Sequence, residues 1–201
     1  MPADLGERAL EHIVLVLIAT LIAAAVAIPA GVAISRRPKI EKWALGFASI
    51  AQTIPSLALL GFLLAVPVIG GIGKTPALVA LILYALLPIL RNTVTGIAGV
   101  DPAIRESAIA MGMTDRQLLQ IVELPLAART IMAGIRIAAV TTIGTATIAA
   151  AIGGGGLGVL IFRGLASVDT REILAGALPA AAMAIAADGG LGWLERRFSR
   201  S

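Results

Sequence analysis

Long apolar stretches recur along the chain, and most of the charged residues lie between them. The stretches cover residues 13–34, 45–66, 76–98, 130–152 and 173–194. A helix needs roughly 20 apolar residues to cross the hydrocarbon core of a bilayer, so each stretch is long enough for one span. The pattern therefore predicts an all-α membrane protein of about five transmembrane helices, which together form a single domain over residues 1–201.

Pro55, Pro88 and Pro179 each lie inside one of these predicted helices. A proline frees a carbonyl group of the preceding turn, but neighbouring helices can satisfy that group in a membrane protein. We therefore expect each of these stretches to remain one spanning helix, including the second, which Pro55 interrupts. The glycine-rich segment 153–168 leaves a shorter re-entrant element open as an alternative.

The composition indicates lipid rather than water as the surrounding medium. Of the 201 residues, 58% are hydrophobic and 14% are charged, whereas an ordinary soluble domain is about 25% charged. The mean hydropathy is +0.96. The net charge of +4 would suggest nucleic-acid binding in a soluble protein, but the basic residues cluster at helix ends. We therefore expect the lipid bilayer, and no nucleic acid, as a partner.

The residues that usually hold metals are scarce. The chain has no cysteine and a single histidine, His12, so neither a thiolate site nor a typical pair of zinc-binding histidines can form. We expect no metal and no cofactor in this chain.

Basic residues are concentrated on one side of the predicted helices. Arg36, Arg37, Lys39 and Lys42 follow the first helix, and further arginines flank the connection 101–125 and the last helix. Loops rich in lysine and arginine remain in the cytoplasm. The distribution predicts a multi-pass protein whose N-terminus is outside and whose C-terminus is cytoplasmic.

The connection 101–125 is too polar to span a membrane, yet it contains two helix starts. Asp101 is a suitable N-cap, and Pro102 then takes the first helical position. Thr114 and Gln117 have the spacing of a capping box. The segment therefore predicts two short helices on the cytoplasmic face. An amphipathic helix that lies in the membrane interface is the alternative.

The turn between these two helices is expected at Gly112, because glycine readily ends a helix. We expect Ile121, Leu124 and Pro125 to close the second helix.

The same connection resembles the cytoplasmic coupling motif of ATP-binding cassette (ABC) importer permeases. That motif begins Glu-Ala-Ala, has a glycine a few residues later and ends Ile-x-x-Leu-Pro. The matching residues are Glu106, Ser107, Ala108, Gly112, Ile121, Leu124 and Pro125. Only Ser107 departs from the pattern, and serine is also small. The resemblance implies that this element docks into a groove of a cytoplasmic ABC ATPase subunit and transmits its nucleotide-driven motion.

A wider resemblance extends over about residues 10–190 to the permeases that import osmoprotectants such as glycine betaine, carnitine or choline. It rests on the runs 52–58, 84–93, 133–136, 144–147 and 152–158. The resemblance implies the type I ABC importer permease fold and a bacterial inner or plasma membrane. It also implies an extracytoplasmic substrate-binding protein and a second permease copy or paralogue as partners. The alternatives are import of methionine or another small solute and, with less support, a non-transport membrane scaffold.

Polar residues inside membrane helices are candidates for a translocation path. The candidates are Gln52, Ser56, Tyr84, Asn92, Thr142 and Thr145. Within one continuous helix, Gln52 and Ser56 would share a face. Hydrogen bonding between helices explains such residues equally well.

The chain is not expected to be an enzyme. Gly71 to Thr75 lacks the glycine that a phosphate-binding loop has five positions before Gly73. Asp188 is the only acid deep in a predicted span, so the chain lacks facing carboxylates, and we expect Asp188 to pair with an arginine that the sequence does not identify. Arg136 is expected to extend its charged group toward lipid phosphates. The resemblance implies that ATP and Mg are bound by the partner ATPase.

Overall fold

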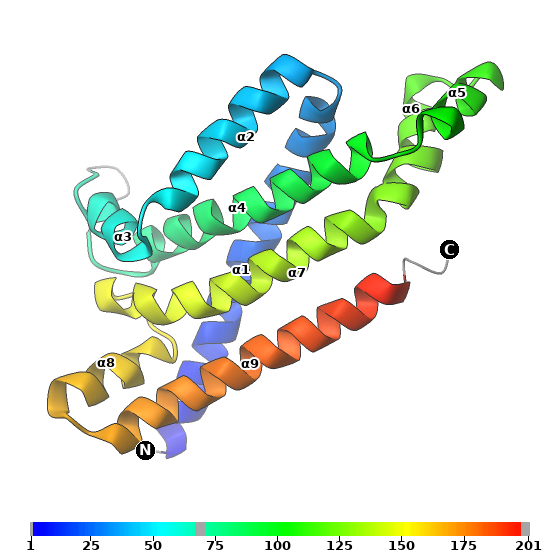
Figure 1. Ribbon diagram of the computed structural model, residues 1–201. Helices are drawn as coiled ribbons and strands as arrows, with labels where there is room; N and C mark the ends of the chain where they lie inside the picture. Colours follow the sequence, from blue (N-terminus) through cyan, green and yellow to red (C-terminus); the bar gives the residue numbers. More distant parts are fainter. Residues whose placement is uncertain (1, 67–70, 198–201) are drawn as a thin grey trace.

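The computed structural model describes residues 2–66 and 71–197, and all regular elements in this part of the chain are helices (Figure 1). In chain order they are α1 (Pro2–Ser35), α2 (Pro38–Thr53), α3 (Ser56–Leu64), α4 (Lys74–Ala98), α5 (Pro102–Ala110), α6 (Asp115–Gln117), the π-helix η1 (Leu118–Glu123), α7 (Leu124–Ala149), the 3₁₀-helix η2 (Ala150–Ile152), α8 (Gly158–Ser167) and α9 (Thr170–Arg197).

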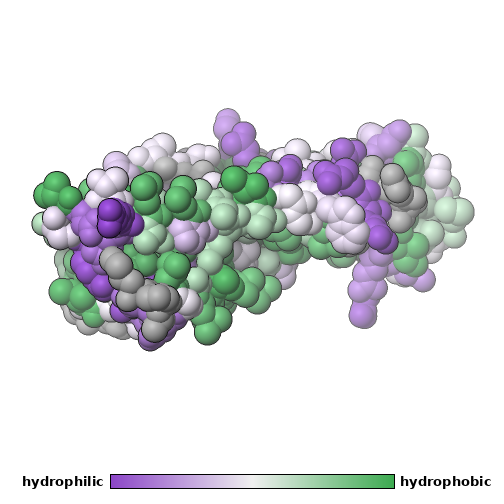
Figure 2. All heavy atoms as spheres, turned by 90° about the horizontal axis from the view of Figure 1, so that it is seen from below, coloured by the Kyte–Doolittle hydropathy of each residue, from purple (hydrophilic) through white to green (hydrophobic). Residues whose placement is uncertain are grey.

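Four helical stretches in the described part of the chain are long and apolar enough to cross a membrane. They are Asp4–Ser35, Lys74–Ala98, Asp115–Ile152 and Thr170–Arg197. These stretches correspond to the first, third, fourth and fifth predicted helices. Figure 2 shows hydrophilic residues gathered toward the two ends of one face, with hydrophobic residues between them. This distribution suits a bundle whose middle lies in lipid.

The second predicted helix, 45–66, is not continuous. The chain leaves the helical conformation at Ile54 and Pro55, where ψ is 122° and 137°, and two shorter helices of 16 and 9 residues lie on either side. Proline disfavours helical geometry in the residue before it and cannot donate a hydrogen bond of its own. The prediction of one helix through Pro55 is therefore wrong, whereas the helices α4 and α9 do continue through Pro88 and Pro179.

The core is formed where α1, α4 and α7 cross (Figure 1). Ala23 and Ala27 of α1 are fully buried against Ala85 of α4 and Ala138 of α7. At Gly134, an added Cβ would lie 2.6 Å from the Cβ of Asn92. Small residues thus let the helix backbones approach closely, which is how membrane helices associate.

The glycine-rich segment after α7 is a tight connection followed by a short helix. Gly153, Gly155 and Gly156 have φ values of 83°, 82° and 74°, a region that side chains other than glycine rarely adopt. The helix α8 that follows has 10 residues, fewer than a span needs. It packs beside the start of α9 (Figure 1).

Candidate functional site

The segment 101–125 has the local structure that its capping residues predict. The Asp101 carboxylate accepts a hydrogen bond of 2.8 Å from the Ala103 backbone N–H. Gly112 follows α5 with φ of 82°. Thr114 and Gln117 form a complete capping box, in which the Thr114 N–H donates to the Gln117 side-chain oxygen at 2.9 Å. The two expected helix starts and the glycine turn are confirmed.

The end of this segment differs from the prediction. Leu124 and Pro125 do not close a short second helix, because they form the first turn of α7. The preceding residues form a π-helix, in which the Leu124 N–H donates to the Leu119 carbonyl. Pro125 has no N–H to offer to the Ile121 carbonyl four residues earlier, and a π-helix is a local adjustment found at such points. The segment is therefore joined rigidly to a membrane-spanning helix.

Glu123 anchors the segment to the bundle, a role that is absent from the predictions made from the sequence. It is only 3% exposed. Its carboxylate lies 2.9 Å from Arg36 Nη2 at the end of α1 and 3.0 Å from Arg105 Nε in α5. Arg105 also donates to the Ile97 carbonyl at the end of α4. One buried carboxylate therefore ties α5 to two membrane helices, and we call this region the Glu123 end of the molecule. Its only sequence signal was an acid directly before the Leu-Pro pair.

Large apolar side chains project from these anchored short helices. In α5 and the turn after it, Ile109 is 59% and Met111 is 71% exposed, and in η1 Ile121 is 59% exposed. Glu106, Ser107 and Gly112 are also exposed, whereas Ala108 is buried. Exposed apolar residues rimmed by polar ones mark interaction surfaces. The predicted motif thus contains residues exposed at the surface as well as one buried residue, Ala108.

Two of the candidate path residues flank the break between α2 and α3. Ser56 is the first residue of α3, and the Tyr84 hydroxyl donates to the Ile54 carbonyl within the break. Gln52 lies in α2, and its side chain falls outside the described part of the structure. Because the break separates Gln52 from Ser56, the expected shared helix face does not form. The structure instead brings Tyr84 to an unwound piece of backbone, and backbone of this kind lines substrate sites in other transporters.

Of the other candidate path residues, Thr142 is buried, whereas Asn92 and Thr145 are half-buried. The Asn92 amide donates to the Pro88 carbonyl at 2.8 Å. Thr142 is fully buried, and its hydroxyl has no hydrogen-bond partner among the described residues. The Thr145 hydroxyl donates to the Thr141 carbonyl of its own helix. These side chains are therefore not gathered into one polar cluster with Tyr84.

Asp188 pairs with Arg136, which the sequence did not identify as its partner. Arg136 lies 3.3 Å from Asp188 and 3.2 Å from Glu195. The expectation that Arg136 reaches toward lipid alone is therefore wrong, since its guanidinium group joins α7 to α9. In residues 2–66 and 71–197, no group of three or more metal-binding side chains is present.

The opposite end of the bundle is held by Glu11, and we call it the Glu11 end. The Glu11 carboxylate lies 2.5 Å from Lys74 Nζ and 3.0 Å from Arg8 Nη1, and it accepts a hydrogen bond of 2.9 Å from the Gly156 N–H. Gly73, directly before α4, donates its N–H to the Ile152 carbonyl at 2.8 Å. Glu11 thus links α1 to the start of α4 and to the glycine-rich connection.

Taken together, the fold and these two ends define a multi-pass membrane protein with an exposed segment that is anchored to its membrane helices. Residues 12–200 match the model of the family described as "Binding-protein-dependent transport system inner membrane component". The chain belongs to this family of ABC transporter permeases.

Individual relatives agree with that assignment. The carnitine transport permease protein OpuCD of Listeria monocytogenes is 49% identical over 94% of this chain and 84% of its own length. The glycine betaine/carnitine/choline transport system permease protein OpuCB of Bacillus subtilis is 47% identical over 93% of this chain and 85% of its own length. A chain of the inward-facing MetNI methionine ABC transporter superposes with a TM-score of 0.88 over 98% of this chain and 97% of that chain, at 21% identity. The type I ABC importer permease fold predicted from the sequence is therefore confirmed.

Proposed function

We propose that this chain is the translocation subunit of an ATP-driven, binding-protein-dependent importer, and that its 101–125 segment docks onto a cytoplasmic ABC ATPase subunit. The observation that carries the proposal is the exposed apolar surface of α5 and η1, which Glu123 anchors to α1. A surface that must transmit movement needs both an apolar face for its partner and a rigid link to the membrane helices. ATP and Mg are bound by the ATPase, and this chain carries out no hydrolysis.

The proposed substrates are osmoprotectants such as glycine betaine, carnitine or choline. Relatives whose names specify these compounds are 46–49% identical to this chain. The methionine transporter chain has the same fold, but at 21% identity it does not argue for methionine. A separate extracytoplasmic binding protein selects the substrate, because this chain is only 3% aromatic and cages for quaternary ammonium groups are built from aromatic rings.

The proposed orientation has the N-terminus outside and the C-terminus in the cytoplasm. Arg36, Arg37 and Lys39 follow α1 close to the Glu123 end, and Arg196 and Arg197 lie in the last turn of α9. Positive residues of this kind remain in the cytoplasm. The translocation path forms between this chain and a second permease copy or paralogue. The break at Ile54–Pro55, with Ser56, Gln52 and Tyr84 beside it, contributes to that path, as do Asn92, Thr142 and Thr145.

The test is uptake of labelled glycine betaine, carnitine, choline and methionine into proteoliposomes that contain the complete transporter, with its ATPase and binding protein. Gly112→Val is the informative variant. Gly112 has φ of 82° with nothing within 4 Å of an added Cβ, so valine would strain only the turn of the coupling segment. We expect uptake of at least one osmoprotectant by the wild type and loss of most of it in the variant.

Gly6→Val is the matched control, because Gly6 also has open space around it but lacks a positive φ. The control should transport normally. Uptake of methionine alone would move the substrate to the alternative class while keeping the permease assignment. Equal uptake by Gly112→Val and wild type would contradict the proposed role of the 101–125 segment.

A further inference from the structure

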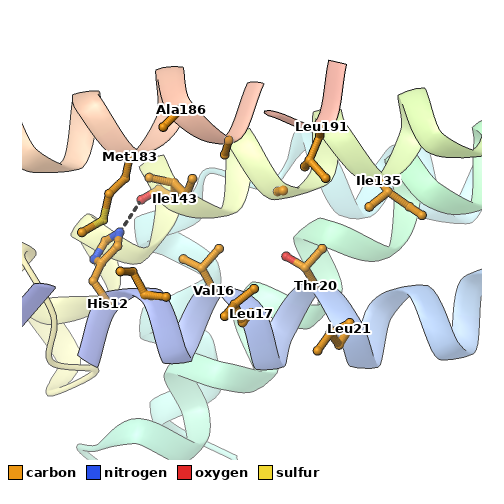
Figure 3. Close-up of a pocket in the computed structure, with 13 residues that line it drawn as sticks. His12, Val16, Leu17, Thr20, Leu21, Ile135, Ile143, Met183, Ala186 and Leu191 are labelled. Carbon is orange, nitrogen blue, oxygen red and sulfur yellow. Dashed lines mark hydrogen bonds between the residues drawn. The ribbon is translucent and has the colours of Figure 1, made fainter. Parts of the chain in front are cut away.

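A groove of about 410 Å³ runs between α1, α7 and α9 (Figure 3). Val16 and Leu21 of α1 form one wall, Ile135 of α7 forms the floor, and Met183 and Leu191 of α9 form the other wall. Every lining residue except His12 and Thr20 is apolar. The groove therefore suits a hydrocarbon chain rather than a polar solute.

The groove opens beside the outer face of α9. On this helix Leu178 is 63% and Ile185 is 74% exposed, and no other element in the described part of the chain covers them. In a membrane such side chains face lipid. If the groove were empty, the side chains of its walls would lose van der Waals contacts. Entry of a lipid chain restores these contacts and is therefore favourable.

Cationic groups converge beyond one end of the groove, one turn past Leu191. Arg136 Nη1 and Arg196 Nη1 lie 3.5 Å and 3.7 Å from the position that a Cβ on Gly192 would occupy. Arg129 is also close, and its Nε atom lies 3.8 Å from Glu195 Oε1, which is near the upper limit for an ion pair. The three arginines face only two carboxylates here, Glu195 and Asp188. The cluster keeps one positive charge in excess, and Arg196 forms no ion pair within residues 2–66 and 71–197.

The distance between the charged cluster and the far end of the groove fits one membrane leaflet. Arg196 lies thirteen positions after Met183 in α9, which is about 20 Å along a helix axis. Half of a bilayer, including its headgroup region, is also about 20 Å thick. An amphiphile with an anionic head at Arg196 and a chain that ends near Met183 would therefore sit at its normal depth.

From these features we propose that the α1–α7–α9 groove binds one anionic phospholipid of the cytoplasmic leaflet. The phosphate lies between Arg129, Arg136 and Arg196, and one acyl chain fills the groove as far as Met183. Basic pockets between membrane helices on the cytoplasmic side recognise anionic headgroups in this way. The choice of leaflet rests on the orientation given with the proposed function.

The experiment measures lipid retention on the purified complete transporter, without any transport step. The complex is stripped of lipid in detergent and offered equal amounts of phosphatidylglycerol and phosphatidylcholine with identical chains, and the retained lipids are counted by native mass spectrometry. A basic residue near the headgroup contributes about a fivefold preference for an anionic lipid. We expect wild type to prefer phosphatidylglycerol, and Arg129→Gln/Arg196→Gln to lower that preference by about 25-fold.

Three further variants separate the site from its alternatives. Arg197→Gln is the matched control, because the Arg197 guanidinium lies 4.5 Å over the Trp193 ring and should leave the preference unchanged. Arg129→Lys/Arg196→Lys should retain most of the preference, which separates lost charge from misfolding. Ala186→Phe places a ring in the groove from an exposed position and should lower retention of both lipids.

Equal retention of the two lipids by wild type would overturn the proposal. This is the result expected if a second protein copy, rather than lipid, covers the groove. An equally large loss in Arg197→Gln would also overturn it, since the preference would then reflect general positive charge. Because binding is measured without uptake, a failure of the proposed transport function would leave this result intact, and the reverse also holds.

Discussion

Each end of the helix bundle is held by one carboxylate, but the two carboxylates have different surroundings. Glu123 is 3% exposed and binds two guanidinium groups, those of Arg36 and Arg105. Glu11 binds the Lys74 ammonium group, whose side chain is 63% exposed. The Glu123 end thus has a nearly buried carboxylate with partly exposed partners, whereas both the carboxylate and the lysine of the Glu11 end are more open to water and salt.

This difference matters because the strength of an ion pair depends on its exposure. Water and dissolved salt weaken exposed pairs strongly and buried pairs much less. The Glu123 end carries the segment proposed to transmit movement, and a stiff connection suits that task. The Glu11 end holds a glycine-rich connection through a backbone N–H and a flexible lysine, which suits a region that changes shape.

The largest expected effect comes from Glu123→Gln, which keeps the shape of the side chain but removes its charge. Arg36 and Arg105 would lose their shared partner. Breaking a fully buried pair costs about 3–5 kcal/mol, and we expect roughly 2–3 kcal/mol here because both arginines are partly exposed. Thermal unfolding of the assembled transporter should show the loss, and the ATP hydrolysed per substrate imported should rise.

Glu7→Gln is the control for that prediction, since Glu7 is exposed and forms no ion pair in the described part of the chain. An unchanged unfolding temperature together with an unchanged ratio of ATP to substrate in Glu123→Gln would show that the two ends are not held differently.

A smaller effect is expected for Gly155→Ala at the Glu11 end. The added Cβ would lie 2.5 Å from the Glu11 Cδ, at a backbone φ of 82°. The left-handed conformation costs an alanine about 1–2 kcal/mol, and the contact adds to this, so we expect about 2 kcal/mol of destabilisation. Thermal unfolding measures the change.

Gly144→Ala is the matched control for this substitution. Gly144 lies in the interior of a helix, with no atom within 4 Å of an added Cβ, and alanine there should stabilise by about 0.5–1 kcal/mol. If both variants were more stable than wild type, the glycine-rich connection after α7 would not be packed against Glu11.

The smallest loss of stability is expected for Glu11→Gln. Its dependence on salt tests directly whether the two ends of the bundle differ. Glutamine can still accept the Gly156 N–H, so only the partly exposed ion pairs are lost, at about 1 kcal/mol. Salt near 1 M shortens the screening length to about 3 Å. The gap in unfolding temperature between Glu11→Gln and wild type should therefore narrow with added salt, while the gap for Glu123→Gln persists. Parallel salt dependence of the two gaps would contradict the distinction between the ends.

Local signals in the sequence were sufficient wherever neighbouring residues determine the conformation. Asp101 caps α5, and Thr114 with Gln117 caps the next helix, as their spacing predicts. Four of the apolar stretches also lie within long helices, as predicted, although two of these helices begin well before the predicted span. In each case the interactions lie within one helix, or between one helix and its lipid surroundings.

The two prolines Pro55 and Pro88 show where such signals are insufficient. Both lie in apolar stretches of similar length, yet only Pro55 ends a helix. Pro88 is buried, and Gly134 of α7 packs against its carbonyl group. Pro55 is exposed, so no comparable packing restores its helix. The outcome depends on neighbours that are distant in the sequence.

The sequence by itself determined that this chain is a helical membrane permease with a capped segment between two of its spans. Hydrophobic length, capping and the coupling motif are all encoded by residues close together in the chain. Only the tertiary structure decided which carboxylate anchors that segment, because Glu123 and Arg36 are 87 positions apart and meet only when α1 packs beside α7. The same holds for the α1–α7–α9 groove, whose walls come from three separate helices. A contact between distant residues depends on helix packing, which no local pattern specifies.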